Sequence, residues 1–320
     1  MGLAMSIERV AVPTDEEWHE ARHHDVTASV AGCLLGVHEY QSAFGLWALK
    51  TGAIVEDPEE TPPMKRGRHL EVVAVNLLRE QHPDWQIIHN SGPDRVYLRD
   101  PDVRLGATID VFANDPARGP GVVQVKTVEG GVYRRKWRDP ESGDVTPPLW
   151  IAVQGIVEAH LAEVEWVDVA PLVVGFGLDM PLIPVPLHAG IIDRVRAEVA
   201  DFWRMIDEGR APDPDWKRDG RLIEALYRPT GEIIDLSAEN DLPELADEKD
   251  RLSGERSAAD TRLKEIKTQF LAKLGGASQA RIADGRLITA SRVNRKAYEV
   301  AAHSYVNVTV KKPRTMENAE

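Results

Sequence analysis

Three polar side chains interrupt an apolar hairpin pattern near the middle of the chain. Residues 105–128 read LGATIDVFANDPARGPGVVQVKTV, with Asp110 inside the β-prone segment 107–112. Gln124 and Lys126 alternate with valines in the next segment, so they share one face of a strand. The turn-forming residues between the two segments predict that the strands pair as a hairpin.

An acid facing an amide and a lysine indicates a place for chemistry, because buried polar groups are costly unless they pair or bind a metal. Mg²⁺ takes oxygen ligands, among them one or two carboxylates, and keeps several waters. It polarises a phosphate and lowers the pKa of a bound water, and a nearby lysine offsets transition-state charge. These residue types suit metal-assisted hydrolysis of a phosphodiester, but the pattern alone occurs often by chance, and a plain salt bridge between Asp110 and Lys126 is the alternative.

Helical and strand patterns surround the hairpin. Thr14 and Glu17 predict a capping box before a helix over residues 15–24. Further helices are expected over residues 27–35, 42–50, 64–81, 148–161 and 188–209. The strands are expected in one mostly antiparallel or mixed sheet, over residues 85–89, 96–99, 107–112, 122–128, 166–174 and 183–186. The fold class is α/β (α+β), with a central mixed β-sheet flanked by helices.

Two domains are expected, a core over residues 1–216 and an extension over residues 217–320. The extension contains a charged helix over residues 242–274 and a short β segment over residues 280–311, which includes the turn dipeptide Asp284–Gly285 and a last strand over 304–310. Apolar residues recur every seven positions in the helix, at Leu245, Leu252, Ala259 and Ile266. Lys249 and Arg256 occupy alternate positions, so one long helix or a helical hairpin is expected rather than a long coiled coil.

Charge and composition bound the function. The net charge of −13 argues at first against nucleic acid, which normally needs a basic surface. The segment RRKWR is locally basic, however: Arg134, Arg135 and Lys136 are suited to phosphates and Trp137 to stacking on a base, against the alternative of a solvated loop. The single cysteine, Cys33, excludes an intrachain disulfide. Without an apolar leader or a membrane-length apolar run, a cytoplasmic protein is expected.

Several motifs occur in the order of a known family. Arg22 precedes TASVAGCLLG, and further matches follow at LWALKTG (46–52), MKRGRHLE with Glu71, Arg99–Asp100, Asp110, GVVQVKT (121–127) and the helix 148–159 with Gln154. Over residues 20–216 the chain resembles the YqaJ-like viral recombinases, the phage lambda-type exonucleases of the PD-(D/E)XK nuclease superfamily. It departs from the family pattern at Ile109, usually proline, and at Gln124, usually an acid.

The resemblance implies a restriction-endonuclease-like core and a Mg²⁺-dependent deoxyribonuclease, with Mn²⁺ as a substitute metal. Such an enzyme digests linear duplex DNA from 5′ ends and leaves a 3′ overhang for a single-strand annealing protein. It also implies a ring-shaped trimer, working in a bacterial or phage-infected cell. The implied catalytic residues are Lys126, Asp110, Gln124 and Glu71. The implied metal ligands are Asp110, Gln124, Glu71, the Val125 carbonyl and Asp100, and the implied DNA contacts include Arg22, Ser29 and Gln154.

Two other interpretations remain open. One is another nuclease on the same fold, such as a restriction-like endonuclease or an exonuclease with an iron–sulfur centre, although the chain lacks the cysteine cluster for the latter. The other is a catalytically weak DNA-binding or scaffold protein, in which Gln124 marks lost metal affinity. Glu16, His19 and His23 have helical spacing, but a chance surface pattern is favoured over a zinc site.

Overall fold

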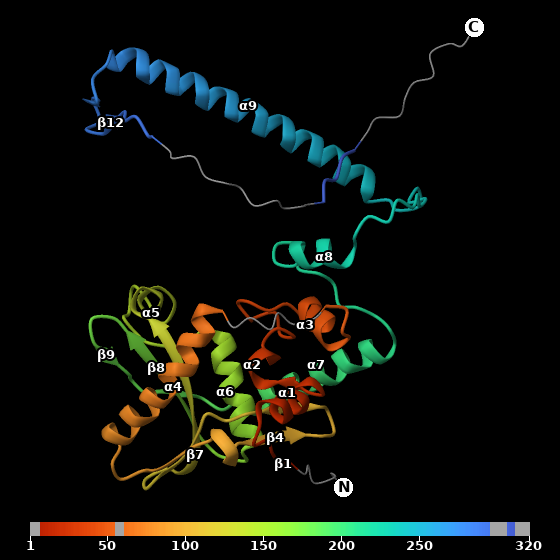
Figure 1. Ribbon diagram of the computed structural model, residues 1–320, viewed down its shortest axis with the longest axis vertical. Helices are drawn as coiled ribbons and strands as arrows, with labels where there is room; N and C mark the ends of the chain where they lie inside the picture. The colour runs from red at the N-terminus through yellow and green to blue at the C-terminus, as the bar shows by residue number, and fades with distance from the viewer. Residues whose placement is uncertain (1–6, 55–60, 295–305, 311–320) are drawn as a thin grey trace. The chain divides into compact units, whose positions relative to one another are not determined.

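The computed structural model describes residues 7–54, 61–294 and 306–310 (Figure 1). The chain divides into two compact units, Met1–Leu226 and Tyr227–Glu320. The first unit therefore extends ten residues beyond the expected boundary at residue 216 and includes the short helix α8, Gly220–Leu226. Each unit is described separately below.

The hairpin of interest lies in the larger sheet of the first unit. In the described ranges this sheet is six-stranded, with the order β10-β8-β7-β6-β3 and β9 paired to β8. Only the pairing of β7 with β8 is parallel, so the sheet is mixed, which confirms the predicted fold class. Its strands are β3 (Gln86–His89), β6 (Val111–Asp115), β7 (Gly119–Glu129), β8 (Val167–Val174), β9 (Leu178–Asp179) and β10 (Ile183–Val185).

The prediction of a single sheet is wrong. The described part of the first unit contains a further four-stranded sheet with the order β1-β4-β5-β2. Its strands are β1 (Glu8–Ala11), β2 (Val26–Thr27), β4 (Val96–Asp100) and β5 (Leu105–Ala107).

The predicted strand 107–112 is accordingly broken between the two sheets, and Asp110 lies in the break. The backbone there is bonded to other segments: the Asn90 side chain donates to the Ile109 carbonyl (2.8 Å), and the Asn90 N–H donates to the Asp110 carbonyl (3.0 Å). The Trp18 indole N–H also donates to Thr108 Oγ1 (2.7 Å).

Helices surround the sheets at nearly the expected places. The helices of the first unit are α1 (Asp15–His23), α2 (Ala28–Ala31), α3 (Ala43–Lys50), α4 (Pro62–Gln81), α5 (Gly130–Lys136), α6 (Leu149–Leu161), α7 (Ala189–Asp207) and α8, with a 3₁₀ turn η1 at Gly92–Asp94. The capping box at Thr14 and Glu17 is confirmed. The helix expected over 27–35 is wrong in extent, because Thr27 pairs in β2 with β5 and only α2 is helical.

The helices α4 and α6 cover opposite faces of the larger sheet (Figure 1). On β7, Val123 and Val125 pack in one apolar cluster with Ala74, Val75 and Leu78 of α4. Val122 packs in the other cluster with α6 residues. Since side chains alternate along a strand, Gln124 and Lys126 share one face, as the sequence pattern predicts, and in the structure this face meets α6. Burying each such valine or leucine stabilises the fold by roughly 1.5–3 kcal/mol. This packing holds β7, and with it the polar side chains that β7 carries, in a fixed position.

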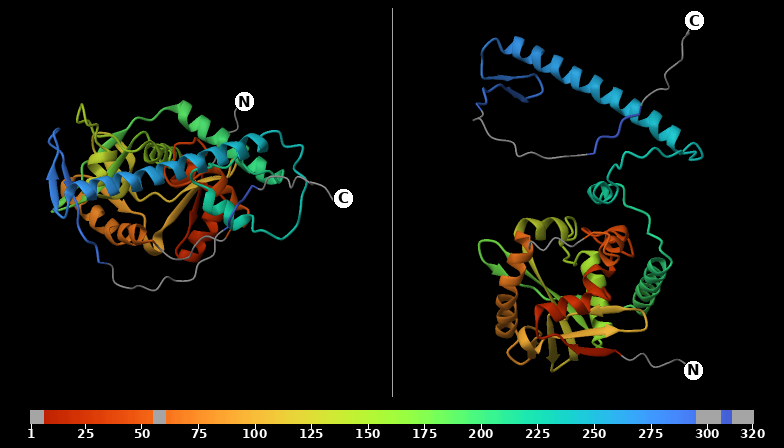
Figure 2. Two further views of the ribbon diagram at one scale, coloured as in Figure 1. Left: turned by 90° about the horizontal axis from the view of Figure 1, so that it is seen from above. Right: turned by 45° about the vertical axis from the view of Figure 1, so that its right-hand side comes forward.

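The second unit contains one long helix, α9 (Leu242–Leu274), which Figure 2 shows as continuous. It ends at Gly275, whose left-handed backbone (φ 56°) suits glycine. The hairpin of β11 (Gln279–Arg281) and β12 (Leu287–Thr289) follows, around the predicted turn at Asp284–Gly285. Of the strand expected over 304–310, residues 306–310 are irregular and the first two lie outside the described residues. No helix in the described ranges is long and apolar enough to span a membrane.

Candidate active site

Asp110 lies where β3, β6 and β7 meet. Its backbone is held by Asn90, which follows β3 and also bonds to both the N–H (2.7 Å) and the carbonyl (2.9 Å) of Val96. Asn90 therefore ties the start of β4 to the break that carries Asp110. The sequence patterns did not identify Asn90, because an isolated asparagine at a strand end is also typical of an ordinary turn.

The Asp110 carboxylate is bonded to the middle of β7. Its Oδ2 atom accepts from the backbone N–H of Val125 (2.9 Å) and from the side-chain amide of Gln124. The same Gln124 nitrogen also donates to the Val125 carbonyl (3.1 Å). Two acceptor oxygens, from Asp110 and Val125, thus point at a single donor nitrogen. The predicted grouping of Asp110, Gln124 and Val125 is present in the structure.

A second layer of polar groups lies behind Gln124, on helix α6. Gln154 Nε2 donates both to Gln124 Oε1 (2.9 Å) and to Glu158 Oε1 (2.7 Å). Gln124, Gln154 and Glu158 are only 2%, 5% and 1% exposed. The prediction that Gln154 contacts DNA is therefore wrong, because its buried amide supports Gln124 instead. Glu158 was missed, although a glutamine and a glutamate four residues apart on an apolar helix face each other and were a visible signal.

Burial dominates the electrostatics of these acids. Burial, together with the charge of Glu71, raises the pKa of Asp110 to about 7, while Lys126 and the Val125 N–H act in the opposite direction. Burial also raises the pKa of Glu158 to about 8, with a further contribution from the charge of Asp110. The charge of Glu71 thus favours the protonated form of Asp110, and the charge of Asp110 favours that of Glu158, a situation that a bound cation would relieve.

Lys126 and Glu71 border this cluster. The Lys126 ammonium lies 5.7 Å from the centre of the Trp150 ring on α6. Among the described residues it makes no ion pair with Asp110, so the salt-bridge alternative is wrong. Glu71, on α4, bonds through Oε1 to His89 Nε2 (2.8 Å), and the other ring nitrogen of His89 contacts Ser91 Oγ (3.1 Å).

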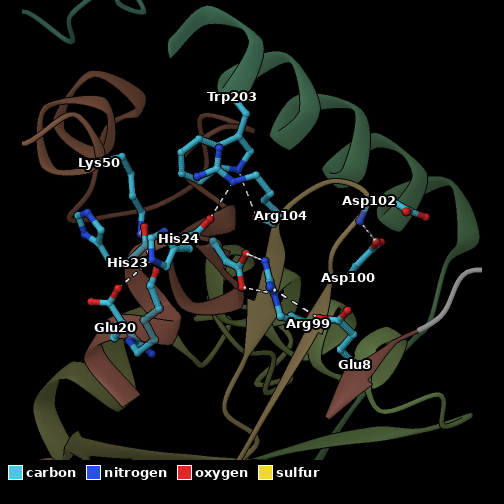
Figure 3. A network of polar contacts seen from close by, with 12 residues as sticks. Glu8, Glu20, His23, His24, Lys50, Arg99, Asp100, Asp102, Arg104 and Trp203 are labelled. Atoms are coloured by element: carbon cyan, nitrogen blue, oxygen red, sulfur yellow. Dashed lines mark hydrogen bonds and ion pairs between the residues drawn. The ribbon is translucent and has the colours of Figure 1, made fainter. Parts of the chain in front are cut away.

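Asp100 forms an ion pair with Arg196 and, among the described residues, none with the groups around Asp110. It lies at the end of β4 in the smaller sheet, is 1% exposed, and forms an ion pair with Arg196 of α7 (3.0 Å). Its Oδ1 atom also accepts from the Asp102 N–H (3.1 Å), as Figure 3 shows. A role for Asp100 as a metal ligand stays a prediction.

Arg22 and the segment TASVAGCLLG, the first of the family motifs, lie at and after the end of α1. Lys50, from the LWALKTG segment, donates to the backbone carbonyls of Arg22 (2.8 Å) and His23 (3.2 Å), and Figure 3 shows Lys50 close to His23. The Arg22 guanidinium lies over the Trp18 ring (4.4 Å). Ser29 Oγ is 3.0 Å from Thr27 Oγ1, in the adjoining turn between β2 and α2. The two motifs are therefore one structural unit.

The RRKWR segment is part of helix α5 and the residues after it, not a loop. Glu129 caps this helix by accepting from the N–H groups of Gly131 (2.8 Å) and Val132 (2.9 Å). Arg134, Arg135 and Lys136 are exposed. Trp137 is 3% exposed and packs in the apolar core, so the prediction that it stacks on a base is wrong.

An exposed aromatic residue does lie beside this helix. Tyr40 is 70% exposed, and the Lys136 ammonium lies 5.8 Å from its ring centre, while Lys136 also pairs with Glu39. Tyr40 neighbours Trp150 (6.1 Å between ring centres), the residue that Lys126 approaches.

The groups around Gln124 fit a hard divalent cation. Within the described ranges no set of three or more His, Cys, Asp and Glu side chains is close enough to hold a metal. The donors at this point are mixed instead: the Asp110 carboxylate, the Val125 carbonyl and an amide, with Glu71 nearby, and Mg²⁺ needs only one or two carboxylates. As it lies, however, Gln124 presents its nitrogen to Asp110, so the amide must turn before its oxygen can ligate.

Taken together, the fold and the site define an α/β domain with an acid, an amide and a lysine at one strand pair of a mixed sheet. Residues 17–158 match the model of the YqaJ-like viral recombinase domain. The match spans the region in which most of the sequence motifs lie, and it confirms the family resemblance. No curated protein matches the chain.

Solved structures with a related chain path include an alkaline exonuclease from Laribacter hongkongensis. It is 18% identical, with 61% of this chain and 93% of that chain covered and a TM-score of 0.48. A phage-related exonuclease from Haemophilus somnus 129PT is 10% identical, with 58% and 96% covered and a TM-score of 0.40. These likenesses are distant, and the family match carries the assignment.

Proposed function

We propose that the protein is a Mg²⁺-dependent deoxyribonuclease that degrades linear duplex DNA from 5′ ends in phage-type recombination. The observation that carries the proposal is the cluster on β7, where Asp110, Gln124 and the Val125 carbonyl converge and Lys126 follows on the same strand face. The family match of residues 17–158 supports it.

The residues have distinct roles in this proposal. Asp110, the Val125 carbonyl and the turned amide of Gln124 hold Mg²⁺, and Glu71 joins them from α4. Bound Mg²⁺ polarises the phosphate and favours ionisation of the attacking water. Lys126 orients that water and offsets the negative charge that develops on the phosphate. The Trp150 ring beside Lys126 keeps its ammonium on the site side of the strand.

DNA is held by an exposed basic and aromatic surface. Arg134, Arg135 and Lys136 lie on α5, which begins directly after β7, and contact phosphates there. Tyr40 offers an exposed ring for a base. By family resemblance, Arg22 and Ser29 lie near the DNA end, the product is a 3′ overhang for a single-strand annealing protein, and the chain forms a trimer. Size-exclusion chromatography with light scattering tests the trimer, which corresponds to three chains of 35.5 kDa.

The decisive experiment compares linear and closed circular duplex DNA incubated with Mg²⁺ or with EDTA, using 5′- and 3′-labelled ends. The wild type should release the 5′ label first, from linear DNA only and only with Mg²⁺. Lys126→Ala should lose this activity, while Lys217→Ala, an exposed lysine elsewhere in the first unit, should keep it. Cutting of circles would support an endonuclease instead. Binding without Mg²⁺-dependent loss of either substrate would refute both enzymes and favour a scaffold.

A further inference from the structure

Gln124 is neutral at a position where the family usually has an acid. Of the groups converging on β7, only the Asp110 carboxylate therefore carries a negative charge to attract a divalent cation. We infer that Glu158 of α6 supplies the acidic ligand that Gln124 lacks, so that the carboxylate of this metal site has moved from strand β7 to helix α6. This inference rests on the proposed Mg²⁺ dependence of the same site.

The burial of Glu158 needs an explanation that the fold alone does not give. Its side chain is 1% exposed on a helix whose neighbouring buried residues, such as Val153, Ile156 and Val157, are apolar. An unpaired buried carboxylate is expensive, and helix stability gains nothing from it. Within the described part of the chain, Glu158 Oε2 is buried without any hydrogen-bond partner. A residue that served only to hold Gln154 could be a neutral amide.

The hydrogen bonds connect Glu158 to the β7 cluster. Gln154 Nε2 lies between Glu158 Oε1 and Gln124 Oε1, and Gln124 Nε2 lies between Asp110 Oδ2 and the Val125 carbonyl. Two amide nitrogens therefore separate the half-buried carboxylate of Asp110 from the buried carboxylate of Glu158 and give each of them a donor. A cation between the carboxylates would neutralise both, which amide donors achieve only in part.

The orientation of Gln124 favours Glu158 as the acidic ligand. The Gln124 oxygen is already engaged by Gln154, whose nitrogen is held in turn by Glu158. Among the described residues, two buried oxygens in this chain of bonds lack a hydrogen-bond partner, Glu158 Oε2 and Gln154 Oε1, and only the first belongs to an acid. Besides Asp110, which Gln124 contacts directly, Glu158 is thus the carboxylate linked to Gln124 by these bonds, and it has a buried oxygen without a partner among the described residues.

Metal affinity of the full-length protein tests the inference without relying on activity. Binding of Mn²⁺ is measured by electron paramagnetic resonance and binding of Mg²⁺ by calorimetry. Glu158→Gln keeps the shape and the hydrogen bond to Gln154 and removes the charge, so it should weaken metal binding by about ten- to a hundredfold. Glu165→Gln, an exposed control close in sequence, should bind as the wild type does. The double variant Gln124→Glu with Glu158→Gln returns the charge to the strand and should recover most of the lost affinity.

The outcomes separate the two proposals. Wild-type affinity in Glu158→Gln would overturn the role of Glu158 and leave the proposed nuclease intact, and so would a double variant as weak as Glu158→Gln alone. Absence of metal binding in the wild type would refute the Mg²⁺ dependence itself and the inference with it. Circular dichroism of each metal-free variant confirms that the chain is folded, and Gln124→Glu alone, expected to bind more tightly than the wild type, gives a second measurement.

Discussion

Replacing Gln124 by glutamate should make the stability of the first unit depend on metal and on pH. In the structure the Gln124 nitrogen donates to the Asp110 carboxylate and to the Val125 carbonyl. Gln124→Glu replaces this donor by an acceptor oxygen that faces both of them. The folded state then contains two carboxyl groups in contact, away from most solvent.

The size of the effect follows from the two lost bonds. A hydrogen bond to a charged group contributes about 1.5–3 kcal/mol and a neutral one about 0.5–1.5 kcal/mol. The variant should therefore lose about 2–4 kcal/mol in EDTA at pH 8.5, where both carboxyl groups are ionised. Mg²⁺ at a hundred times its Kd should restore about 2.7 kcal/mol, because it binds the folded state alone.

The pH dependence has a definite sign. The pKa of Asp110 is already raised to about 7, and a second carboxylate raises it further, whereas acids in the unfolded chain titrate near their ordinary values. The folded variant therefore binds more protons than the unfolded chain above about pH 4, so its stability falls as the pH rises through the raised pKa. At pH 5.5 the two carboxyl groups share a proton, and the loss should be much smaller.

Urea unfolding followed by tryptophan fluorescence measures these losses in EDTA and in Mg²⁺, at pH 5.5 and 8.5. Gln86→Glu, which adds the same charge at an exposed position of β3, is the matched control and should change little. The reasoning is refuted when Gln124→Glu unfolds like the wild type in EDTA at pH 8.5. It is also refuted when Mg²⁺ fails to restore a lost stability.

Three further outcomes are expected. Asn90→Ala should cost about 2–4 kcal/mol in urea unfolding, since it leaves the buried backbone of Val96 and Ile109 unpaired; an unchanged midpoint would contradict this. Tyr40→Ala should weaken duplex binding in Ca²⁺ by about fivefold or more in fluorescence anisotropy, with Tyr40→Phe as the control that keeps the ring. Wild-type Mg²⁺ affinity by calorimetry should rise about tenfold from pH 6 to pH 8, because Asp110, with its pKa raised to about 7, must lose its proton; a flat profile would argue against Asp110 as a ligand.

The parts of the site that depend on local periodicity could be predicted from the sequence. The alternation of valines with Gln124 and Lys126 fixes which face of β7 they share, and the structure confirms that this face meets α6. The proximity of Asp110 to Gln124 was also predictable from the hairpin pattern. The break in the chain around it was not, because it depends on bonds from Trp18 and Asn90, residues far from Asp110 in the sequence.

The burial of individual side chains, such as Trp137 and Gln154, also could not be predicted from local sequence patterns. Trp137 follows three cations and was expected at the surface with them, yet it is the first residue after α5 and turns into the core. Gln154 was expected to contact DNA, yet α6 packs against the larger sheet and α2, and Gln154 is buried there with its amide on Gln124. In both cases the packing of a whole helix decides the exposure of one side chain.

Gln124 and Glu158 are therefore better judged as a pair than one at a time. Read from the strand alone, a glutamine at this position suggests a nuclease that has lost metal affinity. The structure places a buried carboxylate on the other side of Gln154, two hydrogen bonds from Gln124, with one oxygen unpartnered among the described residues. If charge and not its position on the backbone determines metal affinity, a neutral residue on the strand is compatible with a working site whenever the facing helix carries the acid. The scaffold interpretation then requires the loss of both acids, and this chain retains Glu158.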